Sequence, residues 1–423
     1  MAGKVWLVGA GPSDGGLLTL KGKAVLEQAE VVVFDALVGP EILAWIPPQA
    51  EKINVGKRAG CHLKSQEEIN RILLEKALEG RRVVRLKGGD PFLFGRGGEE
   101  LELLTACGVA YEVVPGVTSA VAVPAYCGIP VTHRDFCSSV HIITGHKRQG
   151  KPLELPFRAL AETGGTLVFL MGLTALPEIC QGLLEAGLPP ETPAAVLEKG
   201  TTAEQRTLVA DLETLPRRTA EAGMQTPAII VVGGVCACGE KFAWREKLPL
   251  FGCRAVVTRP RERAGTLAAR LRTLGAEVLE VPAIETVALK EVPGWEAFLT
   301  QLEESSWLVF TSGRGVELFL EKLRTSGRDI RALHRARIAA IGPGTEAELR
   351  KYGLLAELIP QVFDGQHLGG ALASRLRPGD RVWLPRAKQG AGSCWKSWKR
   401  SRVRWYGSCP FTTQCTSLPG PWI

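Results

Sequence analysis

The 423-residue sequence lacks any apolar run close to the roughly 18 residues that a membrane-spanning helix needs. Its best apolar runs, such as Val31–Phe34 and Ala228–Val232, have the length of single strands. The N-terminus enters a strand and a glycine turn directly, without the pattern of a signal peptide. We therefore expect a soluble protein that does not associate with membranes and is located in the cytoplasm.

The cysteine and histidine patterns of metal sites and redox pairs are also missing. The 11 cysteines include no C-x-x-C pair, and the 6 histidines show neither H-x-H nor H-E-x-x-H spacing. In a cytosolic protein such scattered cysteines are expected to be buried or idle thiols. The sequence accordingly predicts no metal ligands.

Acidic residues are absent from the end of the chain, where the last one is Asp380. Beyond Gln389 the tail carries five lysine and arginine residues, which is five of the eight net positive charges of the sequence. Basic residues interleaved with tryptophan could bind a nucleic acid, but this tail has no apolar periodicity and no motif of a binding module. Its composition favours a shifted reading frame instead. We expect no nucleic-acid partner and no native element over residues 388–423.

Short apolar runs alternate with helical patterns along the rest of the chain, which indicates parallel β-α-β units and an α/β fold. A capping box at Ser65–Glu68 begins one expected helix. After a turn at Pro249–Gly252 the pattern resumes and is again typical of a doubly wound α/β domain. The expected strands are 4–9, 31–34, 52–55, 82–86, 167–171, 194–197, 228–232, 254–258, 277–281, 307–311, 337–341 and 381–384.

Three loops follow strands at the edge where α/β sheets bind ligands. The first reads VGAGPSD, and Asp35 closes the next strand, as in a dinucleotide-binding turn. Against that interpretation, Asp14 takes the third glycine position, and Pro12 has no backbone N–H to offer a pyrophosphate. A dinucleotide-binding oxidoreductase and a purely structural glycine turn both remain open on this loop alone.

The second loop, RLKGGDPFLFGRGGEE, holds five glycines between residues 88 and 98. So many glycines would weaken a helix or strand, but they let a ligand lie against the backbone. Asp90 can accept hydrogen bonds from hydroxyls or an amine, and Arg96 presents a fork suited to carboxylates. In the third loop, VPGVTSA, Thr118 and Ser119 stand near a helix start, either as caps or as ligand contacts.

Through these loops and the runs around them, the segment from Lys4 to about Trp244 resembles the uroporphyrinogen-III C-methyltransferases of the tetrapyrrole methylase family. The matching runs follow one another in order: VGAGPSDGGLLTLKG, VVVFDALV, VGKRAG, VVRLKGGDPFLFGRGGEELE, VVPGVTSAVAVPAYCGIPVTHRDF, TLVFLMG, TPAAVLEKGTTAEQRT and TPAIIVVGG. RLKGGDPF together with GRGGEE discriminates best. Ser13 stands where the family usually has a glycine, and Ala36 follows Asp35 where an arginine is common.

The resemblance implies two α/β domains, at about residues 1–143 and 144–245, and a homodimer. It implies two successive C-methylations of uroporphyrinogen III, which give precorrin-2 on the branch towards sirohaem and cobalamin. The methyl donor would be S-adenosylmethionine, bound between the two domains, with S-adenosylhomocysteine as the product. Its sulfonium methyl group is already activated, so the enzyme chiefly has to hold the reactants in near-attack geometry and take up a proton.

The same resemblance implies site residues in both domains. Asp35 and Lys57 would be the proton acceptor and donor, and Arg96 a third catalytic residue. The acidic arms of the tetrapyrrole suggest Arg96, Glu99, Arg134 and Met171 as substrate-binding residues, although Met171 could equally fill the core after a strand. The cofactor-binding residues would be Pro12, Gly88, Gly89, Asp90, Leu93, Thr118, Ser119, Met171, Gly200 and Ala228.

Residues 253–387 resemble uroporphyrinogen-III synthase through VVTRP, FTSGRGV, IGPGTEAEL and VWLPRA. This resemblance implies ring closure of hydroxymethylbilane with inversion of one pyrrole, the step that supplies the methyltransferase substrate. Members of that family continue for roughly another half domain, whereas the match here stops at Ala387. We therefore expect a partial, doubly wound synthase-like region whose activity is absent or very low.

Overall fold

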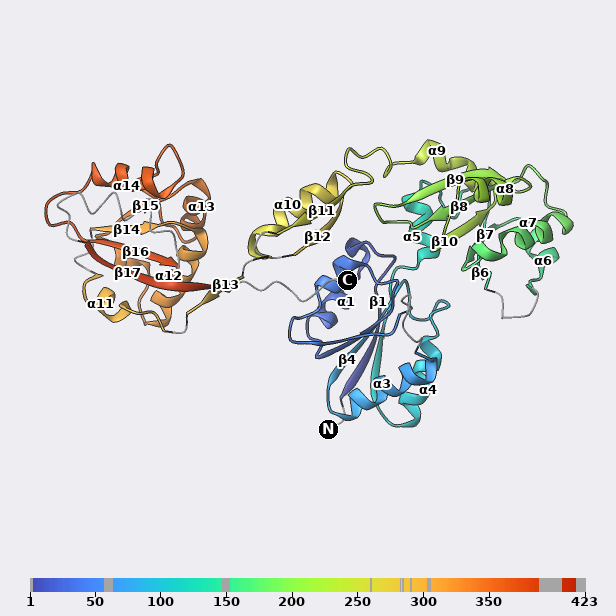
Figure 1. Ribbon diagram of the computed structural model, residues 1–423, viewed down its shortest axis with the longest axis horizontal. Coiled ribbons are helices and arrows are strands. Elements are labelled where there is room, and N and C mark those ends of the chain that lie inside the picture. Colours follow the sequence, from blue (N-terminus) through green and yellow to red (C-terminus); the bar gives the residue numbers. More distant parts are fainter. Residues whose placement is uncertain are drawn as a thin grey trace. The chain divides into compact units, whose positions relative to one another are not determined.

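The computed structural model describes residues 3–56, 64–146, 153–258, 261–281, 283, 285–289, 291–302, 306–387 and 405–415. The chain forms two compact units (Figure 1). The first comprises Met1–Val257 and Arg263–Val281, and the second comprises Thr258–Glu262 and Pro282–Ile423. Both units are α/β, as the sequence predicts. Among the helices described, none combines the length and the apolar character that a bilayer crossing requires.

The first unit begins with a five-stranded sheet of order β3-β2-β4-β1-β5, in which all neighbours are parallel. Alternate side chains of each strand face opposite layers, so that α1 and α2 cover one face and α3 and α4 cover the other. The strands are β1 Lys4–Gly9, β2 Val31–Phe34, β3 Glu51–Asn54, β4 Arg82–Lys87 and β5 Ala110–Val114; the helices are α1 Leu20–Leu26, α2 Pro40–Ala44, α3 Gln66–Leu78 and α4 Gly97–Ala106. The predicted capping box of Ser65 and Glu68 is confirmed at the start of α3.

A second five-stranded sheet follows, of order β6-β7-β10-β8-β9. Only β6 and β7 pair in parallel, and the other pairs are antiparallel, so the parallel units expected from the alternating pattern do not extend through this sheet. Helix α5, which begins directly after β5, packs on one face, and α6, α7 and α8 pack on the other. The elements are α5 Ser119–Tyr126, β6 Val140–Thr144, α6 Phe157–Glu162, β7 Thr166–Leu170, α7 Leu176–Glu185, β8 Pro193–Glu198, β9 Arg206–Asp211, α8 Leu215–Glu221, β10 Ala228–Val232 and α9 Gly239–Phe242.

The first unit ends in a small β-α-β segment made of β11 Arg254–Val257, α10 Arg261–Thr273 and β12 Glu277–Glu280, whose two strands pair in parallel.

The second unit has a five-stranded sheet of order β13-β17-β16-β14-β15, with α14 on one face and α11, α12 and α13 on the other. Its elements are β13 Glu285–Ala288, α11 Trp295–Thr300, β14 Trp307–Phe310, α12 Gly313–Thr325, β15 Arg337–Ala340, α13 Pro343–Lys351, α14 Gly365–Ala373, β16 Val382–Ala387 and β17 Trp405–Cys415.

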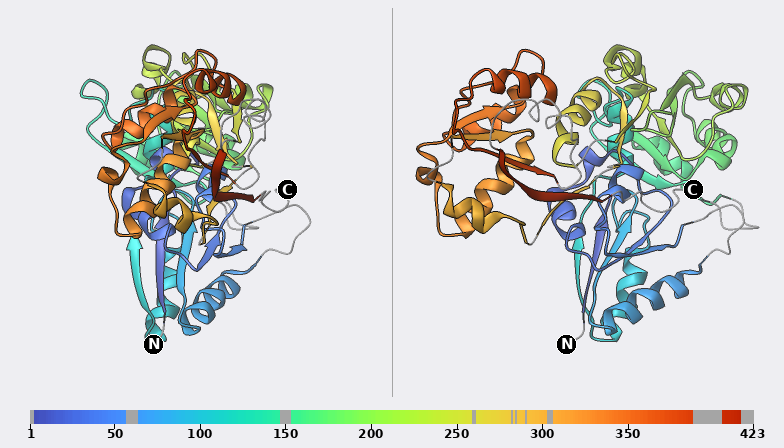
Figure 2. Two further views of the ribbon diagram at one scale, coloured as in Figure 1. Left: turned by 90° about the vertical axis from the view of Figure 1, so that its left-hand side faces the viewer. Right: turned by 60° about the vertical axis from the view of Figure 1, so that its left-hand side comes forward.

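Strand β17 corrects the expectation that residues 388–423 contain no native element. It pairs in parallel with β16 and antiparallel with β13, and it runs along the sheet of the second unit in dark red (Figure 2). The pairing with β16 shifts register twice, after Val382 and after Arg386. Ladder hydrogen bonds come from the backbone, which almost any sequence supplies, so an apolar period is not required for such a strand. Without β17, the hydrogen-bonding edge of β16 would stay open.

The predicted burial of cysteine is confirmed for four thiols of the first unit, which belong to Cys127, Cys180, Cys236 and Cys238. Burial raises the pKa of Cys127 and of Cys180 to about 12. At neutral pH both thiols therefore stay protonated and unreactive. Cys107 and Cys253 are exposed.

Candidate active site

Four loops meet at the carboxyl edge of the first sheet, because its strands are parallel and end on the same side. They follow β1, β2, β4 and β5, which lie next to one another in the sheet. The loops after β1 and β4 are joined by two backbone hydrogen bonds, from Gly11 N to Gly89 O at 3.1 Å and from Gly89 N to Gly11 O at 2.9 Å. This edge is where open α/β sheets bind their ligands.

Two glycines, Gly9 and Gly116, let these loops touch through their backbones. A Cβ atom on Gly116 would lie 2.2 Å from the carbonyl oxygen of Gly89, and one on Gly9 would lie 2.5 Å from the backbone of Gly116. Gly89 itself is different, because its φ is +69° and a Cβ there would meet only the Ser119 backbone nitrogen, at 3.9 Å. Gly9 and Gly116 are thus required for packing, whereas Gly89 borders open space at the start of α5.

The Asp90 carboxylate ties the β4 loop to the β5 loop. Its Oδ1 accepts hydrogen bonds from the backbone N–H of Phe92 at 2.8 Å and of Leu93 at 3.2 Å, and its Oδ2 accepts one from Gly116 at 3.0 Å. The sequence alone predicts that Asp90 binds a ligand. The structure adds that both oxygens already organise the loops, and their remaining lone pairs are what a ligand could use.

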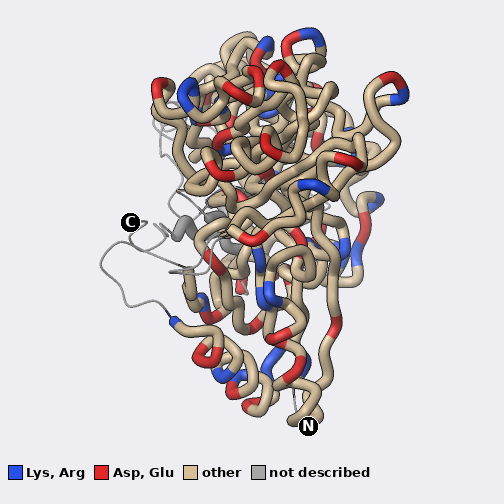
Figure 3. The backbone as a smooth tube through the Cα atoms, turned by 90° about the vertical axis from the view of Figure 1, so that its right-hand side faces the viewer, with Lys and Arg blue, Asp and Glu red and all other residues tan. Residues whose placement is uncertain are grey.

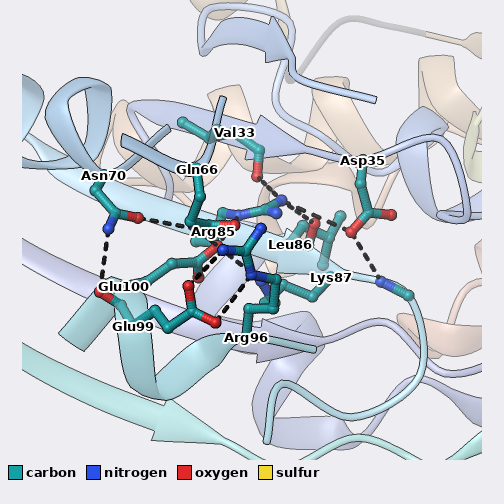
Figure 4. Close-up of polar contacts among 11 residues, drawn as sticks. Val33, Asp35, Gln66, Asn70, Arg85, Leu86, Lys87, Arg96, Glu99 and Glu100 are labelled. Atoms are coloured by element: carbon teal, nitrogen blue, oxygen red, sulfur yellow. Dashed lines mark hydrogen bonds and ion pairs between the residues drawn. The ribbon is translucent and has the colours of Figure 1, made fainter. Parts of the chain in front are cut away.

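Asp35 lies directly after β2, at the same edge. Its Oδ1 accepts from the Leu37 backbone N–H at 3.1 Å, and its Oδ2 accepts weakly from that of Gly88 at 3.4 Å. The Arg85 guanidinium lies 3.8 Å from Oδ2, and the Asp35 side chain is 26% exposed (Figure 4). Asp35 therefore combines a fixed orientation with access to solvent, which a proton acceptor needs.

Beneath this edge lies a buried charge cluster of Arg85, Lys87 and Glu100. The alternation along β4 directs Arg85 and Lys87 to the face that α4 covers, and there Oε1 of Glu100 accepts from Arg85 at 3.0 Å and from Lys87 at 2.7 Å (Figure 4). The Glu100 side chain is fully buried. Burial, and then the charge of Arg85, lower the pKa of Lys87. Arg85 also donates to the Val33 carbonyl at 3.5 Å, which links the cluster to the strand that carries Asp35.

Removing the Glu100 carboxylate is expected to leave two buried cations without their anion. We predict that Glu100→Ala lowers the free energy of unfolding by about 3–5 kcal/mol, as measured by urea denaturation. Glu102→Ala is the matched control, because Glu102 lies on the same helix with an exposed side chain. Equal midpoints for the two variants would contradict this assignment of the cluster.

Arg96 begins α4 as its N-cap residue, with φ +59°. Its guanidinium donates from Nε to Glu99 at 2.9 Å, and both side chains are about half exposed, at 54% and 49%. The hydrogen bond from Arg96 lowers the pKa of Glu99. An incoming carboxylate would therefore share Arg96 with Glu99. Arg134 is exposed between α5 and β6, and Lys57 lies outside the described residues.

In the second sheet, three further candidates come to one edge. The register pairs Ala228 with Glu198 and Ile229 with Leu170, so Met171, Gly200 and Ala228 stand at neighbouring strand ends. Met171 has φ +55° and is 50% exposed. A left-handed backbone at a residue other than glycine is strained, and such strain is frequent at ligand sites.

The loop after β1 contacts both the loop after β8 and the end of α5. The Thr201 hydroxyl donates to the Pro12 carbonyl, and the Tyr126 hydroxyl donates to Asp14 at 3.0 Å. A Cβ atom on Gly200 would lie 2.3 Å from the Val123 side chain, so Gly200 packs against α5. Of the predicted cofactor residues, Pro12 and Gly200 are thus linked through Thr201, which the sequence analysis did not single out.

The backbone conformation also shows why glycine is usual at position 13 in the family. Ser13 has φ +75°, a conformation that glycine adopts without strain. This is the position at which the family usually carries glycine.

Comparison with known proteins now decides the family. The family profile described as Tetrapyrrole (Corrin/Porphyrin) Methylases matches residues 4–216. The chain belongs to the tetrapyrrole methylase family. It is a methyltransferase of this family. This assignment replaces the interpretation of the first loop as part of a dinucleotide-binding oxidoreductase. A second profile, described as Uroporphyrinogen-III synthase HemD, matches residues 265–394 of the same methylase chain.

Two relatives and one solved structure illustrate these matches. The methylase is 50% identical over 382 residues to Porphyrin biosynthesis protein HemD of Ruminiclostridium josui, covering 90% of this chain and 76% of the relative. It is 53% identical over 234 residues to the S-adenosyl-L-methionine-dependent uroporphyrinogen III methyltransferase of Methanosarcina barkeri, covering 55% and 92%. The X-ray structure of a cobalamin biosynthetic enzyme, cobalt precorrin-4 methyltransferase, is similar with a TM-score of 0.50 and 31% identity, covering 55% of this chain and 95% of that one.

Proposed function

We propose that this methylase catalyses two successive C-methylations of uroporphyrinogen III with S-adenosylmethionine, giving precorrin-2 for sirohaem or cobalamin synthesis. The observation that carries the proposal is the open space beside Gly89, at a junction where Gly9 and Gly116 bring three loops into backbone contact. The name of the relative from Methanosarcina barkeri, which is 53% identical over 234 residues, supports the same donor and the same substrate.

The residues present fit the methyl donor in chemical character. In the first domain, the backbone of Gly88 and Gly89 and the hydroxyls of Thr118 and Ser119 border the proposed site. Thr118 also caps α5, where its oxygen accepts from Ala120 N at 3.2 Å and its hydroxyl proton remains available. The other residues proposed to hold the donor are Pro12, Asp90, Leu93, Met171, Gly200 and Ala228.

The chain's own residues have two tasks beyond binding. When bound, S-adenosylmethionine supplies a methyl group already activated on a positively charged sulfur. Asp35 accepts the proton that the macrocycle releases after its pyrrole carbon has been methylated. The Asp35 carboxylate accepts a hydrogen bond from Leu37 N and lies near the Arg85 guanidinium. Arg96 binds an acidic arm of the substrate while Glu99 orients its guanidinium, and Arg134 and Met171 also contact the substrate. Lys57, the proposed proton donor, has no described geometry.

Ligand-dependent melting tests the donor. S-adenosylhomocysteine should raise the melting temperature of the full chain with increasing concentration, whereas NAD or NADP should leave it unchanged, because only a ligand of the native state stabilises it. Stabilisation by the nicotinamide nucleotides alone would overturn the proposal. Formation of precorrin-2 from uroporphyrinogen III, followed by absorbance and mass, tests the substrate.

For the rest of the chain, we propose a methylase region at 1–245, with domains at about 1–143 and 144–245, and an impaired synthase-like region that begins at 253 and extends beyond 387 through the pairing of β17 with β16. Support for impairment comes from the β11–β12 sheet, which has only two strands and leaves Val256 63% exposed. Incubation with hydroxymethylbilane tests it, and efficient formation of the type III isomer would overturn it.

We also propose a cytoplasmic homodimer that binds neither nucleic acid nor membranes. In Figure 3, Lys and Arg are interspersed with Asp and Glu along the described backbone, which does not favour a polyanion partner. Light scattering at micromolar concentration would measure the oligomeric state, and a monomer would contradict the dimer.

A further inference from the structure

The β11–α10–β12 segment resembles the synthase by sequence, yet its contacts place it in the first unit with the methylase. Helix α2 of the methylase is in contact with β12. A Cβ atom on Gly275, in the turn before β12, would lie 2.7 Å from the Leu248 side chain, and Leu250 N donates to the Leu274 carbonyl at 2.8 Å. The segment is therefore packed on the chain that leaves the second methylase sheet.

Its first polar contact is with the loop between β8 and β9. Glu277 of β12 accepts from the backbone N–H of Ala203 at 2.8 Å and from Arg254 at 3.3 Å. Arg254 of β11 also lies 2.8 Å from Glu204. Hydrogen bonding by Lys199 and the charge of Arg254 lower the pKa of Glu204. Glu277 of the segment thus binds the backbone of this loop, and Arg254 binds the Glu204 side chain.

The same loop carries Gly200, which packs against α5, and Thr201, which reaches the loop after β1 in the first sheet. Thr201 has φ +71°, and its hydroxyl donates to the Pro12 carbonyl. Its carbonyl accepts from the buried Arg245 at 2.9 Å. The strained backbone at Thr201 is held from several directions, and the segment supplies one of them, two residues further on at Ala203.

The second polar contact reaches the other side of the Pro12 loop. Arg272 of α10 lies 2.6 Å from Glu41 of α2 and 2.8 Å from Glu280 of β12. The Glu41 side chain is only 15% exposed and borders Gly15, where a Cβ atom would lie 2.7 Å from the Glu41 carboxyl carbon. Burial raises the pKa of Glu41, and the charge of Arg272 opposes that rise.

We propose that the β11–α10–β12 segment is an interaction surface for the methylase domains, and that Arg254 and Arg272 brace the two loops that carry Gly200 and Pro12 for methyl-donor binding. The proposal rests on the proposed function, since it assigns these loops to the donor site. The relative from Methanosarcina barkeri matches over a length that makes up 92% of it, so methylases of this family exist without such a segment. The brace is accordingly expected to tune affinity rather than to permit binding at all.

The test is the dissociation constant for S-adenosylhomocysteine, measured by calorimetry on the full chain. Arg254→Ala combined with Arg272→Ala should weaken binding about fivefold, a coupling of ordinary size between two sites. Arg350→Ala is the matched control: Arg350 is 60% exposed and pairs with Glu346 in the second unit, as Arg254 is 57% exposed and pairs with Glu204. Arg254→Lys combined with Arg272→Ala should bind more tightly than the double alanine variant, because lysine restores most of the affinity that the loss of Arg254 removes.

The outcomes separate the two proposals. If the wild type does not bind S-adenosylhomocysteine, the proposed function fails. If the wild type binds and the double variant binds within twofold of it, the brace is refuted while the function stands. Should the double variant melt at the assay temperature, Glu204→Gln makes the same test from the exposed methylase side, with affinity equal to that of the wild type counting against the brace.

Discussion

Gly89→Val is expected to raise the dissociation constant for S-adenosylhomocysteine by about 100-fold or more, which corresponds to a loss of about 2.7 kcal/mol of binding free energy. The reason is local. A Cβ atom at Gly89 would have the Ser119 backbone nitrogen, at 3.9 Å, as its one neighbour within 4 Å, so the valine methyl groups extend into the open space beside α5. Titration calorimetry below the melting temperature measures the effect.

Backbone strain has to be separated from this steric block. Gly89 has φ +69°, where a residue with a Cβ atom costs about 1–2 kcal/mol. Gly108, at the end of α4, has φ +67° and no heavy atom within 4 Å of a Cβ. Gly108→Val should therefore lose the same stability yet bind the ligand normally. If both variants bind alike, the space beside Gly89 is not the donor site.

Asp35→Asn is expected to lower kcat for methyl transfer by about 10²–10⁴-fold, the range that general acid–base groups contribute, while the affinity for S-adenosylhomocysteine stays within about twofold. Asparagine can keep the hydrogen bond from Leu37 N, since its side-chain oxygen forms the same kind of turn. It cannot accept the substrate proton.

The measurement is single-turnover formation of the methylated tetrapyrrole at saturating methyl donor. Asp135→Asn is the control, because the Asp135 side chain is 79% exposed in the loop before β6. Normal turnover by Asp35→Asn would remove this carboxylate from the mechanism and leave the proton to water or to another group.

The glycine-rich loops and Asp35 could be located from the sequence because each depends on short-range signals. A strand-length apolar run followed by glycines identifies a loop at a sheet edge, and parallel strands bring such edges together. Most strand boundaries differ from the prediction by a residue or so, as in β4, where Lys87 belongs to the strand as well, but β16 ends three residues later than predicted, at Ala387. Strands β5, β6, β9, β13 and β17 were not predicted. In β5, β6 and β9 most residues are half-buried or exposed, so the apolar signal is short.

Pairings between distant residues could not be located in that way. The alternation along β4 places Arg85 and Lys87 on one face, and this signal is present in the sequence. Nothing local shows that the Glu100 carboxylate compensates their positive charges. The contact between Thr201 and Pro12 spans 189 positions in the sequence, and a left-handed backbone at Thr201 has no sequence signature.

By itself, the sequence determined the α/β class, the loops that carry the proposed chemistry and the family. These follow from hydrophobic periods and glycine turns, which are signals that extend over only a few consecutive residues. Only the tertiary structure decided which charges meet beneath Asp35, that β17 belongs to the sheet of the second unit, and that β11–α10–β12 belongs to the first unit. These depend on backbone pairing and on buried ion pairs between distant segments, whose free energy exists only once the chain has brought them together.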